Sequence, residues 1–304
     1  MPAVATAQAQ APPSGGGCTV VGKARLPLVE SQGRFSVQLT LDGQQTLMMV
    51  DTGAQRGALT AQTADRLRLA VGAGPTQHFN GVGGRGPEQH PRLVGRAEFG
   101  PTVWPQYPMQ IIGALQPETP EHPSPAGLLG ADMMSSYDVE LDFPARTMTL
   151  YAVSGCAGDF VPWKGRREVL TPLVGPPDMF VITAAVNGHP IRALIDTGSN
   201  SSSLSRSAAR SAKVSDAMLK LDPVGSYTGA RGVAVPSHRH RFDRLAIGGS
   251  NFSGVDMSVQ DVDFGAFDLL VGMDYLGSRR MWLSYSTHQL FMQTAARPVA
   301  PPAP

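Results

Sequence analysis

Two Asp-Thr-Gly triplets, each at the end of an apolar run, constrain the fold of this chain more than any other feature. The run 47–50 leads into Asp51, and the run 193–195 leads into Asp196. A short apolar run of this kind is typical of a buried strand, so each triplet places a carboxylate at a strand end. Burying one ionised carboxylate is costly, but two carboxylates in one site can share a proton, which raises the pKa of one and leaves the other ionised. The pair is therefore predicted to be an acid/base dyad that activates water.

The two triplets belong to a longer internal repeat. Asp51 and Asp196 are 145 residues apart (196 − 51 = 145), and the same offset relates further identical residues without a gap. These are Pro27 and Pro172, Leu28 and Leu173, Phe35 and Phe180, Gly43 and Gly188, and Leu59 and Leu204. An internal duplication is the simplest explanation, so we expect two similar units in one chain.

In these triplets and their spacing the chain resembles the aspartic proteases, both the single-lobed retropepsin type and the two-lobed pepsin type. The resemblance covers the two repeats and neither terminus. It implies an all-β, two-lobed acid protease fold with pseudo-twofold symmetry and short helices, in which Asp51 and Asp196 face each other at the base of a cleft. The residues that would brace this dyad or shape its loops are Thr52, Gly53, Thr197, Gly198 and Ser199.

The resemblance also implies a function, which is the hydrolysis of peptide bonds by an endopeptidase without a covalent intermediate, a cofactor or a metal. A peptide or protein substrate would lie extended in the cleft. Two alternatives stay open at this point. One is a catalytically silent peptide-binding or assembly protein with a retropepsin fold, and the other is a retropepsin-like homodimer whose sites form between two chains.

Alternation of apolar and polar residues over 35–41 and over 180–186 predicts two half-buried strands. Asp42-Gly43 follows the first strand and Asn187-Gly188 follows the second, and both pairs are preferred in type I′ hairpin turns. Each Asp-Thr-Gly triplet should therefore lie at the end of the return strand of a hairpin.

Short helices are expected soon after each triplet. Thr60 and Ser205 each stand where a helix could begin, and both residue types are preferred at the N-cap. We therefore predict brief helices at 61–69 and 206–212.

A second motif recurs near the end of each repeat, Gly-Leu-Leu-Gly-Ala-Asp at 127–132 and Leu-Leu-Val-Gly-Met-Asp at 269–274. In the resembled family, the apolar pair and the glycine run beside the active-site loop and complete a ψ-shaped crossing under the catalytic aspartate. We interpret Asp132 and Asp274 as caps of a short following helix. The final strands, which would close each lobe, are expected at 138–143, 147–152 and 281–293.

Two glycine-rich segments, 79–86 and 227–232, are interpreted as β-hairpin flaps that close over the substrate, as the resemblance implies. An ordinary mobile surface hairpin is the alternative for each. The first segment also matches G-x-G-x-x-G, but Pro87 and Pro91 argue against the helix that a dinucleotide site requires. Pepsin-type enzymes carry a tyrosine on the first-lobe flap, whereas here the tyrosine is in the second segment. The candidate flap and substrate-binding residues are Gly81, Gly83, Gly84, Tyr227 and Gly229.

Composition limits the partners that this chain can have. Of its 304 residues 42% are apolar and only 16% are charged, and the formal net charge is +1. Such a chain has ample core to bury, but no basic face for nucleic acid and no polybasic segment for anionic lipid. No apolar run approaches the roughly 18–20 residues that span a bilayer. We expect a soluble globular monomer, with a homodimer as the alternative.

The termini and the two cysteines bear on domain organisation and compartment. Cys18 and Cys156 each precede a repeat, so a disulfide could join the two lobe entrances, with two free thiols as the alternative. A periplasmic or secreted location is expected, with the cytoplasm as the alternative. The predicted segments are a disordered leader or export-signal remnant at 1–18, an N-terminal lobe at 19–155, a C-terminal lobe at 156–296 and a disordered tail at 297–304.

The two triplets differ in the residue that follows, which is Ala54 in the first and Ser199 in the second. In pepsin-like enzymes a hydroxyl at this place can bond the outer oxygen of its own aspartate, and such a bond stabilises the charged form. Only Asp196 has this option. We therefore predict that Asp196 is the ionised member of the dyad and that Asp51 is the protonated one.

Overall fold

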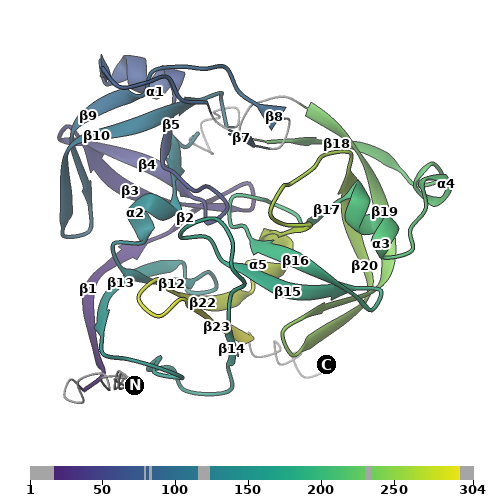
Figure 1. Cartoon of the computed structure of the whole chain (residues 1–304). Helices are drawn as coiled ribbons and strands as arrows, with labels where there is room; N and C mark the ends of the chain where they lie inside the picture. The colour runs from purple at the N-terminus through teal and green to yellow at the C-terminus, as the bar shows by residue number, and fades with distance from the viewer. Residues whose placement is uncertain (1–16, 79, 82–83, 116–123, 230–233, 295–304) are drawn as a thin grey trace, which may run out of the picture.

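The computed structural model describes residues 17–78, 80–81, 84–115, 124–229 and 234–294. They form two lobes of β-sheet, seen side by side in Figure 1, and a third sheet that lies at one end of both. The predicted all-β, two-lobed fold with pseudo-twofold symmetry and short helices is confirmed. Among the described helices, none is long and apolar enough to cross a membrane.

The first lobe is an eight-stranded sheet in the order β2-β3-β4-β11-β5-β10-β9-β6, in which β3 also pairs with β9. A separate hairpin is formed by β7 (Asn80–Gly81) and β8 (Gly84–Arg85). The strands of the sheet are β2 (Val29–Ser31), β3 (Arg34–Leu41), β4 (Gln44–Val50), β5 (Ala58–Thr60), β6 (Ala70–Val71), β9 (Arg92–Phe99), β10 (Thr102–Ile112) and β11 (Gly127–Leu129).

The second lobe repeats this plan in a seven-stranded sheet, in the order β15-β16-β21-β17-β20-β19-β18, in which β15 also pairs with β19. Its strands are β15 (Val181–Val186), β16 (His189–Ile195), β17 (Ser203–Ser205), β18 (Val224–Thr228), β19 (Ala234–Ile247), β20 (Ser250–Gln260) and β21 (Leu269–Val271). Each lobe therefore closes on itself around an apolar interior.

The two predicted hairpins are present, and their turns have the predicted chemistry. Asp42 and Gly43 have φ angles of 48° and 78°, and Asn187 and Gly188 have φ angles of 48° and 81°. A type I′ turn requires positive φ at both central residues, which Asp, Asn and Gly tolerate better than other residues. The turns join β3 to β4 and β15 to β16, so each triplet follows a return strand.

The predicted N-caps are confirmed, and the helices after them are shorter than expected. The hydroxyls of Thr60 and Ser205 accept hydrogen bonds from the backbone N–H three residues on, each at 3.2 Å. Both helices end before Arg68 and Lys213, which have φ angles of 52° and 67°, a left-handed conformation that does not continue a helix. The helices of the described chain are α1 (Ala61–Arg66), α2 (Ala131–Met134), α3 (Arg206–Ser211), α4 (Asp216–Leu219) and α5 (Met273–Leu276).

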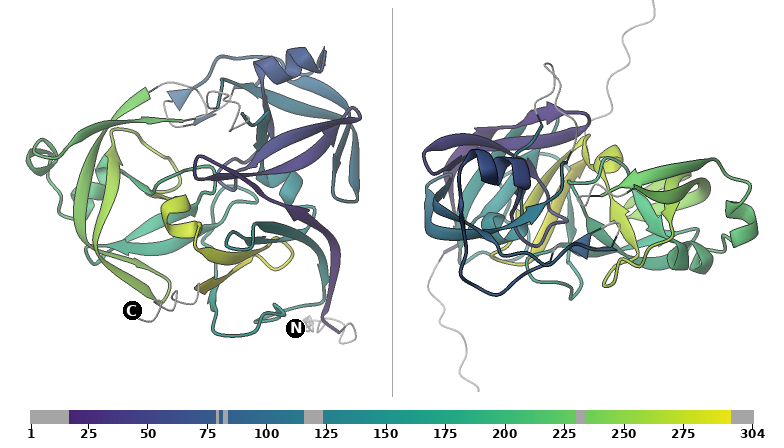
Figure 2. Two further views of the ribbon diagram at one scale, coloured as in Figure 1. Left: turned by 180° about the vertical axis from the view of Figure 1, so that it is seen from behind. Right: turned by 90° about the horizontal axis from the view of Figure 1, so that it is seen from above.

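The final strands were expected to close each lobe separately, and this prediction is wrong. They form one six-stranded sheet that both lobes share, in the order β1-β13-β12-β22-β23-β14, at the bottom of the view in Figure 1. Figure 2 shows the same sheet from behind, below and between the two lobes. Its strands are β1 (Thr19–Pro27), β12 (Asp138–Asp142), β13 (Thr147–Ser154), β14 (Glu168–Leu170), β22 (Arg279–Ser284) and β23 (Gln289–Thr294).

Two buried carboxylates give a physical reason why the final strands of both lobes form one shared sheet. Asp138 and Glu140 on β12 are 2% and 4% exposed, and a buried carboxylate needs hydrogen-bond donors. The second half of the chain supplies them, because Trp282 Nε1 donates to Asp138 at 3.1 Å and Arg280 pairs with Glu140 at 2.7 Å. The antiparallel pairing of β12 with β22 thus supplies donors to Asp138 and adds to the bond that Glu140 accepts from the Tyr151 hydroxyl of β13 at 3.1 Å.

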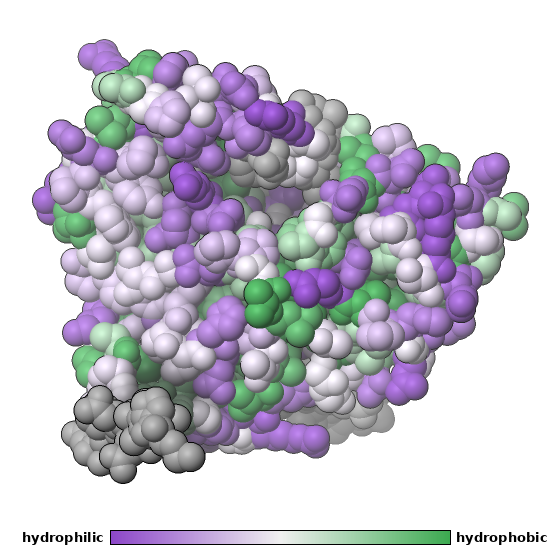
Figure 3. Space-filling model, in the orientation of Figure 1, coloured by the Kyte–Doolittle hydropathy of each residue, from purple (hydrophilic) through white to green (hydrophobic). Residues whose placement is uncertain are grey.

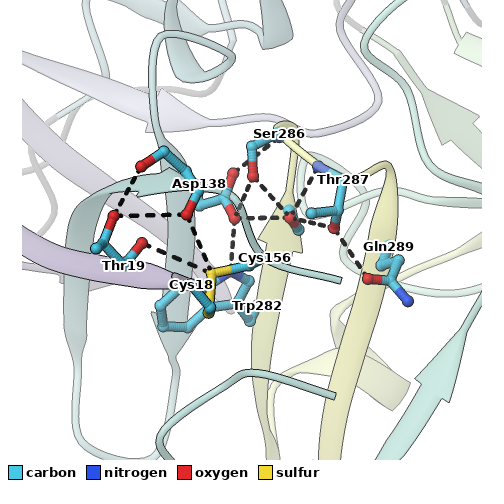
Figure 4. Close-up of a disulfide and its surroundings, with 10 residues drawn as sticks. Cys18, Thr19, Asp138, Cys156, Trp282, Ser286, Thr287 and Gln289 are labelled. Carbon is cyan, nitrogen blue, oxygen red and sulfur yellow. Dashed lines mark hydrogen bonds between the residues drawn. A yellow bond between two sulfur atoms is a disulfide. The ribbon is translucent and has the colours of Figure 1, made fainter. Parts of the chain in front are cut away.

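Of the two alternatives for Cys18 and Cys156, the structure has the disulfide. It links the start of β1 to the segment that follows β13, near Asp138 and Trp282 of the shared sheet (Figure 4). The bond closes a loop with a sequence separation of 138 residues, which encloses the whole first lobe. Closing a loop of that size restricts the unfolded chain, so the bond is expected to stabilise the fold.

This bond makes a prediction about the purified protein. Protein prepared without reductant should show no titratable thiol, because the chain has only two cysteines. Reduction should lower the free energy of unfolding by about 5 kcal/mol, the chain-entropy value for a loop of this size. A Cys18→Ser/Cys156→Ser variant is the control and should not respond to reductant. Two titratable thiols in the native protein would contradict the prediction.

Candidate active site

Each Asp-Thr-Gly triplet is held by the predicted ψ-shaped crossing. β4 lies parallel to β11, and β16 lies parallel to β21, so the two motifs of each repeat run side by side. At the end of the first pair the N–H of Asp51 donates to Leu129 O at 3.1 Å, and at the end of the second the N–H of Asp196 donates to Val271 O at 3.0 Å. The same backbone bonds thus fix both aspartates at the lobe boundary.

The two aspartates meet because glycines let the loops approach closely. A Cβ built on Gly53 would lie 2.6 Å from Cγ of Asp196, and one built on Gly198 would lie 2.5 Å from both carboxylate oxygens of Asp51. Any side chain at either position would collide with the opposite carboxyl group. The glycine of each triplet is therefore required by the aspartate of the other triplet, and one chain assembles the whole pair.

Burial and mutual contact set the electrostatics of the pair. Asp51 and Asp196 are each only 9% exposed. Burial raises the pKa of both carboxyls, and the charge of Asp51 raises the pKa of Asp196 further. Backbone N–H groups of Gly53 and Gly198 donate to the near oxygens at 2.9 and 3.0 Å and oppose this shift. The arrangement favours one proton shared between two carboxyls.

The threonines brace the pair across the lobe boundary, as predicted. Thr52 Oγ1 donates to Ile195 O at 2.6 Å and accepts from Thr197 N at 3.1 Å. Thr197 Oγ1 donates to Val50 O at 2.7 Å and accepts from Thr52 N at 3.1 Å. Both threonines are 1% exposed, so the four bonds are sheltered from water. They lock the two loops together in a fixed register.

Asp132 and Asp274 have a wider role than the predicted helix caps. The residues at the N-cap positions are Gly130 and Gly272, which precede α2 and α5, and they make no side-chain cap bond. Each carboxylate accepts from the N–H of the next residue of its own helix, Met133 or Tyr275, at 2.9 Å. Asp132 also accepts from the N–H of Gly57 at 2.9 Å, and Asp274 from the N–H and Oγ of Ser202 at 2.9 and 2.7 Å. The ψ-shaped crossing places the loops that follow the triplets against α2 and α5, so that N–H and hydroxyl donors of these loops reach the carboxylates. The two carboxylates therefore support these loops.

The predicted bond between Ser199 and Asp196 is wrong. Ser199 Oγ donates to Ser201 O at 3.0 Å and is also bonded to the hydroxyl of Tyr227 on β18. A serine hydroxyl has one proton, so Tyr227 is the donor in that second bond. Both interactions lead away from the aspartate, and the proposed ionisation of Asp196 over Asp51 loses its physical basis. Ser199 anchors the β18–β19 hairpin instead, a contact that its place in the sequence does not reveal.

Both glycine-rich hairpins border a cavity above the aspartates. The cavity has a volume of about 520 Å³ and lies between the lobes, where Figure 3 shows the surface hollowed. Gly81 and Gly84 of the first hairpin line it, as do Tyr227 and Gly229 of the second. Burial raises the pKa of Tyr227 to about 12, so its hydroxyl stays protonated and can donate. Gly83, the remaining predicted flap residue, lies outside the described residues.

Besides the aspartates and Tyr227, the cavity is lined by polar side chains that were not among the residues predicted from the sequence, which are Arg34, Gln55, Arg56, His78, Gln110 and Asp263. Arg34, at the start of β3, lines it beside the aspartates and is half-buried. The second lobe contributes a mainly apolar wall, formed by Met179, Leu194, Val262, Phe264, Phe267 and Leu270. The sequence held no signal for Arg34, because most positions related by the 145-residue offset carry different residues, as Arg34 and Met179 do. Within the described chain no cluster of three or more His, Cys, Asp or Glu side chains is arranged to hold a metal.

Comparison with known proteins agrees with this geometry. A family model described as aspartyl protease matches residues 37–133 and again residues 182–275, so each repeat is recognised separately. The fold is similar to that of the aspartic proteinase from Irpex lacteus, with a TM-score of 0.53 and 11% sequence identity over 93% of this chain and 99% of that one. No curated protein matches the sequence. With two copies of the motif, a two-lobed fold and paired aspartates, the chain belongs to the aspartyl protease family.

Proposed function

We propose that this protein is an aspartic endopeptidase in which Asp51 and Asp196 activate a water molecule. The observation that carries the proposal is the meeting of the two carboxyls in one chain, at the floor of a cavity that can admit a peptide. Because a single chain supplies both aspartates, we propose a monomeric enzyme, and no second copy is needed to complete the site.

The reaction follows from one shared proton. The ionised carboxylate takes a proton from water as the water oxygen attacks the scissile carbonyl carbon. The protonated carboxyl donates a hydrogen bond to the carbonyl oxygen, which becomes a hydroxyl in the tetrahedral intermediate. Collapse of the intermediate breaks the C–N bond, and the leaving nitrogen receives a proton from the dyad. The threonine bonds hold both carboxyls in place throughout, since the acid and the base exchange roles.

A direct test uses a reduced and carboxymethylated protein as an unfolded substrate, with the products identified by mass spectrometry. We expect internal cleavage at mildly acidic pH, which continues in the presence of EDTA and after treatment with serine- and thiol-directed reagents. A peptide whose scissile amide is replaced by a secondary alcohol should inhibit, because it resembles the tetrahedral intermediate. Binding of this peptide without any cleavage of the substrate would favour the catalytically silent alternative.

The position of Arg34 predicts how activity depends on pH. Its positive charge lowers the pKa of both aspartates, against the upward effect of burial. Replacing Arg34 with Met should therefore raise both pKa values. The acid limb of the kcat/KM profile reports loss of the ionised carboxylate and the alkaline limb reports loss of the shared proton, so both should move to higher pH, by up to about one unit. A profile with unchanged limbs would contradict this electrostatic role.

We also propose that the protein matures in an oxidising compartment, the periplasm or the exterior. The disulfide between Cys18 and Cys156 supports this, because reducing cytoplasm does not maintain such bonds. Fractionation of the native host with antibody to the chain tests the location. Recovery with soluble cytoplasmic enzymes would contradict it.

A further inference from the structure

The pseudo-twofold symmetry of the cavity is broken at the position of Arg34, as it is at Arg56, a second lining arginine that corresponds to Ser201. The offset of 145 residues is also a structural equivalence, because Ser36 pairs with Met49 in the first lobe and Val181 pairs with Leu194 in the second. By the same offset Arg34 corresponds to Met179, and both line the cavity. The cavity thus has the positive charge of Arg34 on one side of the aspartates and the uncharged side chain of Met179 at the equivalent position on the other side.

The guanidinium of Arg34 is held in place by a bond to the backbone of the other lobe. Its Nε donates to Gly198 O at 3.1 Å, across the lobe boundary and beside Asp196. Among the described residues it forms no ion pair, and its remaining four N–H donors are available. A fixed, planar fork of donors is the group that proteins use to recognise carboxylates.

The opposite wall has the reverse character. Met179, Leu194 and Leu270 are between 1% and 5% exposed and pack in one cluster with the rings of Phe264 and Phe267. Asp263 borders the same end of the cavity, and its carboxylate accepts from the N–H of Gly265 at 2.8 Å. An acidic substrate side chain would be repelled there, whereas an apolar one would be desolvated and bound.

We propose that Arg34 selects substrates with an acidic side chain on one side of the scissile bond, while the Met179 wall takes a large apolar side chain on the other. This specificity rests on the proposed peptidase function but concerns binding as well as turnover. The charge of Arg34 also reaches both aspartates, so selectivity must be measured as a ratio of two substrates on the same variant. Any effect of Arg34 on the ionisation of the dyad is then the same for both substrates and cancels in the ratio.

The experiment uses peptides in which the two residues that flank the scissile bond are a fixed apolar pair. Either Glu or Gln is placed in turn at each of the three positions beyond this pair on either side. At about pH 6, where Glu is ionised, one position should show a kcat/KM about tenfold higher for Glu, the size of one charge-assisted hydrogen bond. At about pH 3 the glutamate is protonated, and the ratio should fall toward one. Arg34→Met should abolish the ratio at pH 6, and Arg34→Lys should restore part of it. Arg25→Met removes an exposed arginine of β1 that does not line the cavity, and should keep the wild-type ratio.

Binding of non-cleavable analogues, with a secondary alcohol at the scissile position, separates this proposal from the function itself. Fluorescence anisotropy should show the same preference for Glu over Gln, again dependent on Arg34. Cleavage with no preference at any position, or a preference that survives Arg34→Met, would overturn the specificity proposal alone. Selective binding without cleavage would overturn the peptidase function and retain the specificity. Unselective binding without cleavage would overturn both.

Discussion

Replacing either Asp51 or Asp196 with Asn is expected to abolish peptide cleavage, with kcat lowered by about a thousandfold or more, the scale of general acid–base catalysis. Each carboxyl is either the base that deprotonates water or the acid that protonates the carbonyl oxygen, and an amide can do neither. The two changes should not add, because the first already removes the shared proton on which the second acts. The double variant should therefore be no less active than either single variant.

The change from Asp to Asn keeps the shape of the side chain, so the fold should remain. Urea unfolding and circular dichroism can verify this for each variant. Asp65→Asn is the matched control, since the Asp65 side chain is 71% exposed on α1. Full activity in Asp51→Asn or in Asp196→Asn would eliminate the proposed intrachain dyad.

Thr52→Val and Thr197→Val should each destabilise the protein by about 2–4 kcal/mol, because each leaves a buried N–H and a buried C=O without a partner. The Thr52 hydroxyl serves Thr197 N and Ile195 O, and the Thr197 hydroxyl serves Thr52 N and Val50 O. Valine has nearly the same shape as threonine, so packing should change little. Activity should fall as well, since these bonds align the aspartates.

Equilibrium unfolding in urea measures this effect for each threonine. Thr52→Ser and Thr197→Ser retain the hydroxyl and lose only one methyl group, so they should lose about 1 kcal/mol or less. An unfolding midpoint in Thr52→Val equal to that of the wild type would show that water or a shifted loop replaces the hydroxyl.

Features that depend on neighbouring residues could be predicted from the sequence. The turns at Asp42-Gly43 and Asn187-Gly188, and the caps at Thr60 and Ser205, depend on backbone preferences and on bonds that span three residues. The repeat of 145 residues carries this local information twice, which is why the amino-acid sequence is enough to predict that Asp51 and Asp196 meet. The sequence by itself determined which carboxylates lie at the strand ends and how each strand reaches them.

Only the tertiary structure decided which distant groups meet. The pairing of β12 with β22, the bond from Tyr227 to Ser199 and the contact of Arg34 with Gly198 each join segments that are far apart in the chain. A hydroxyl or a guanidinium can bond any acceptor within reach, so the residue type does not specify its partner. For this reason the sequence predicts the wrong neighbour for Ser199 and gives no role to Arg34. Their partners are set by the packing of two lobes whose cores and shared sheet fix the relative positions of the loops.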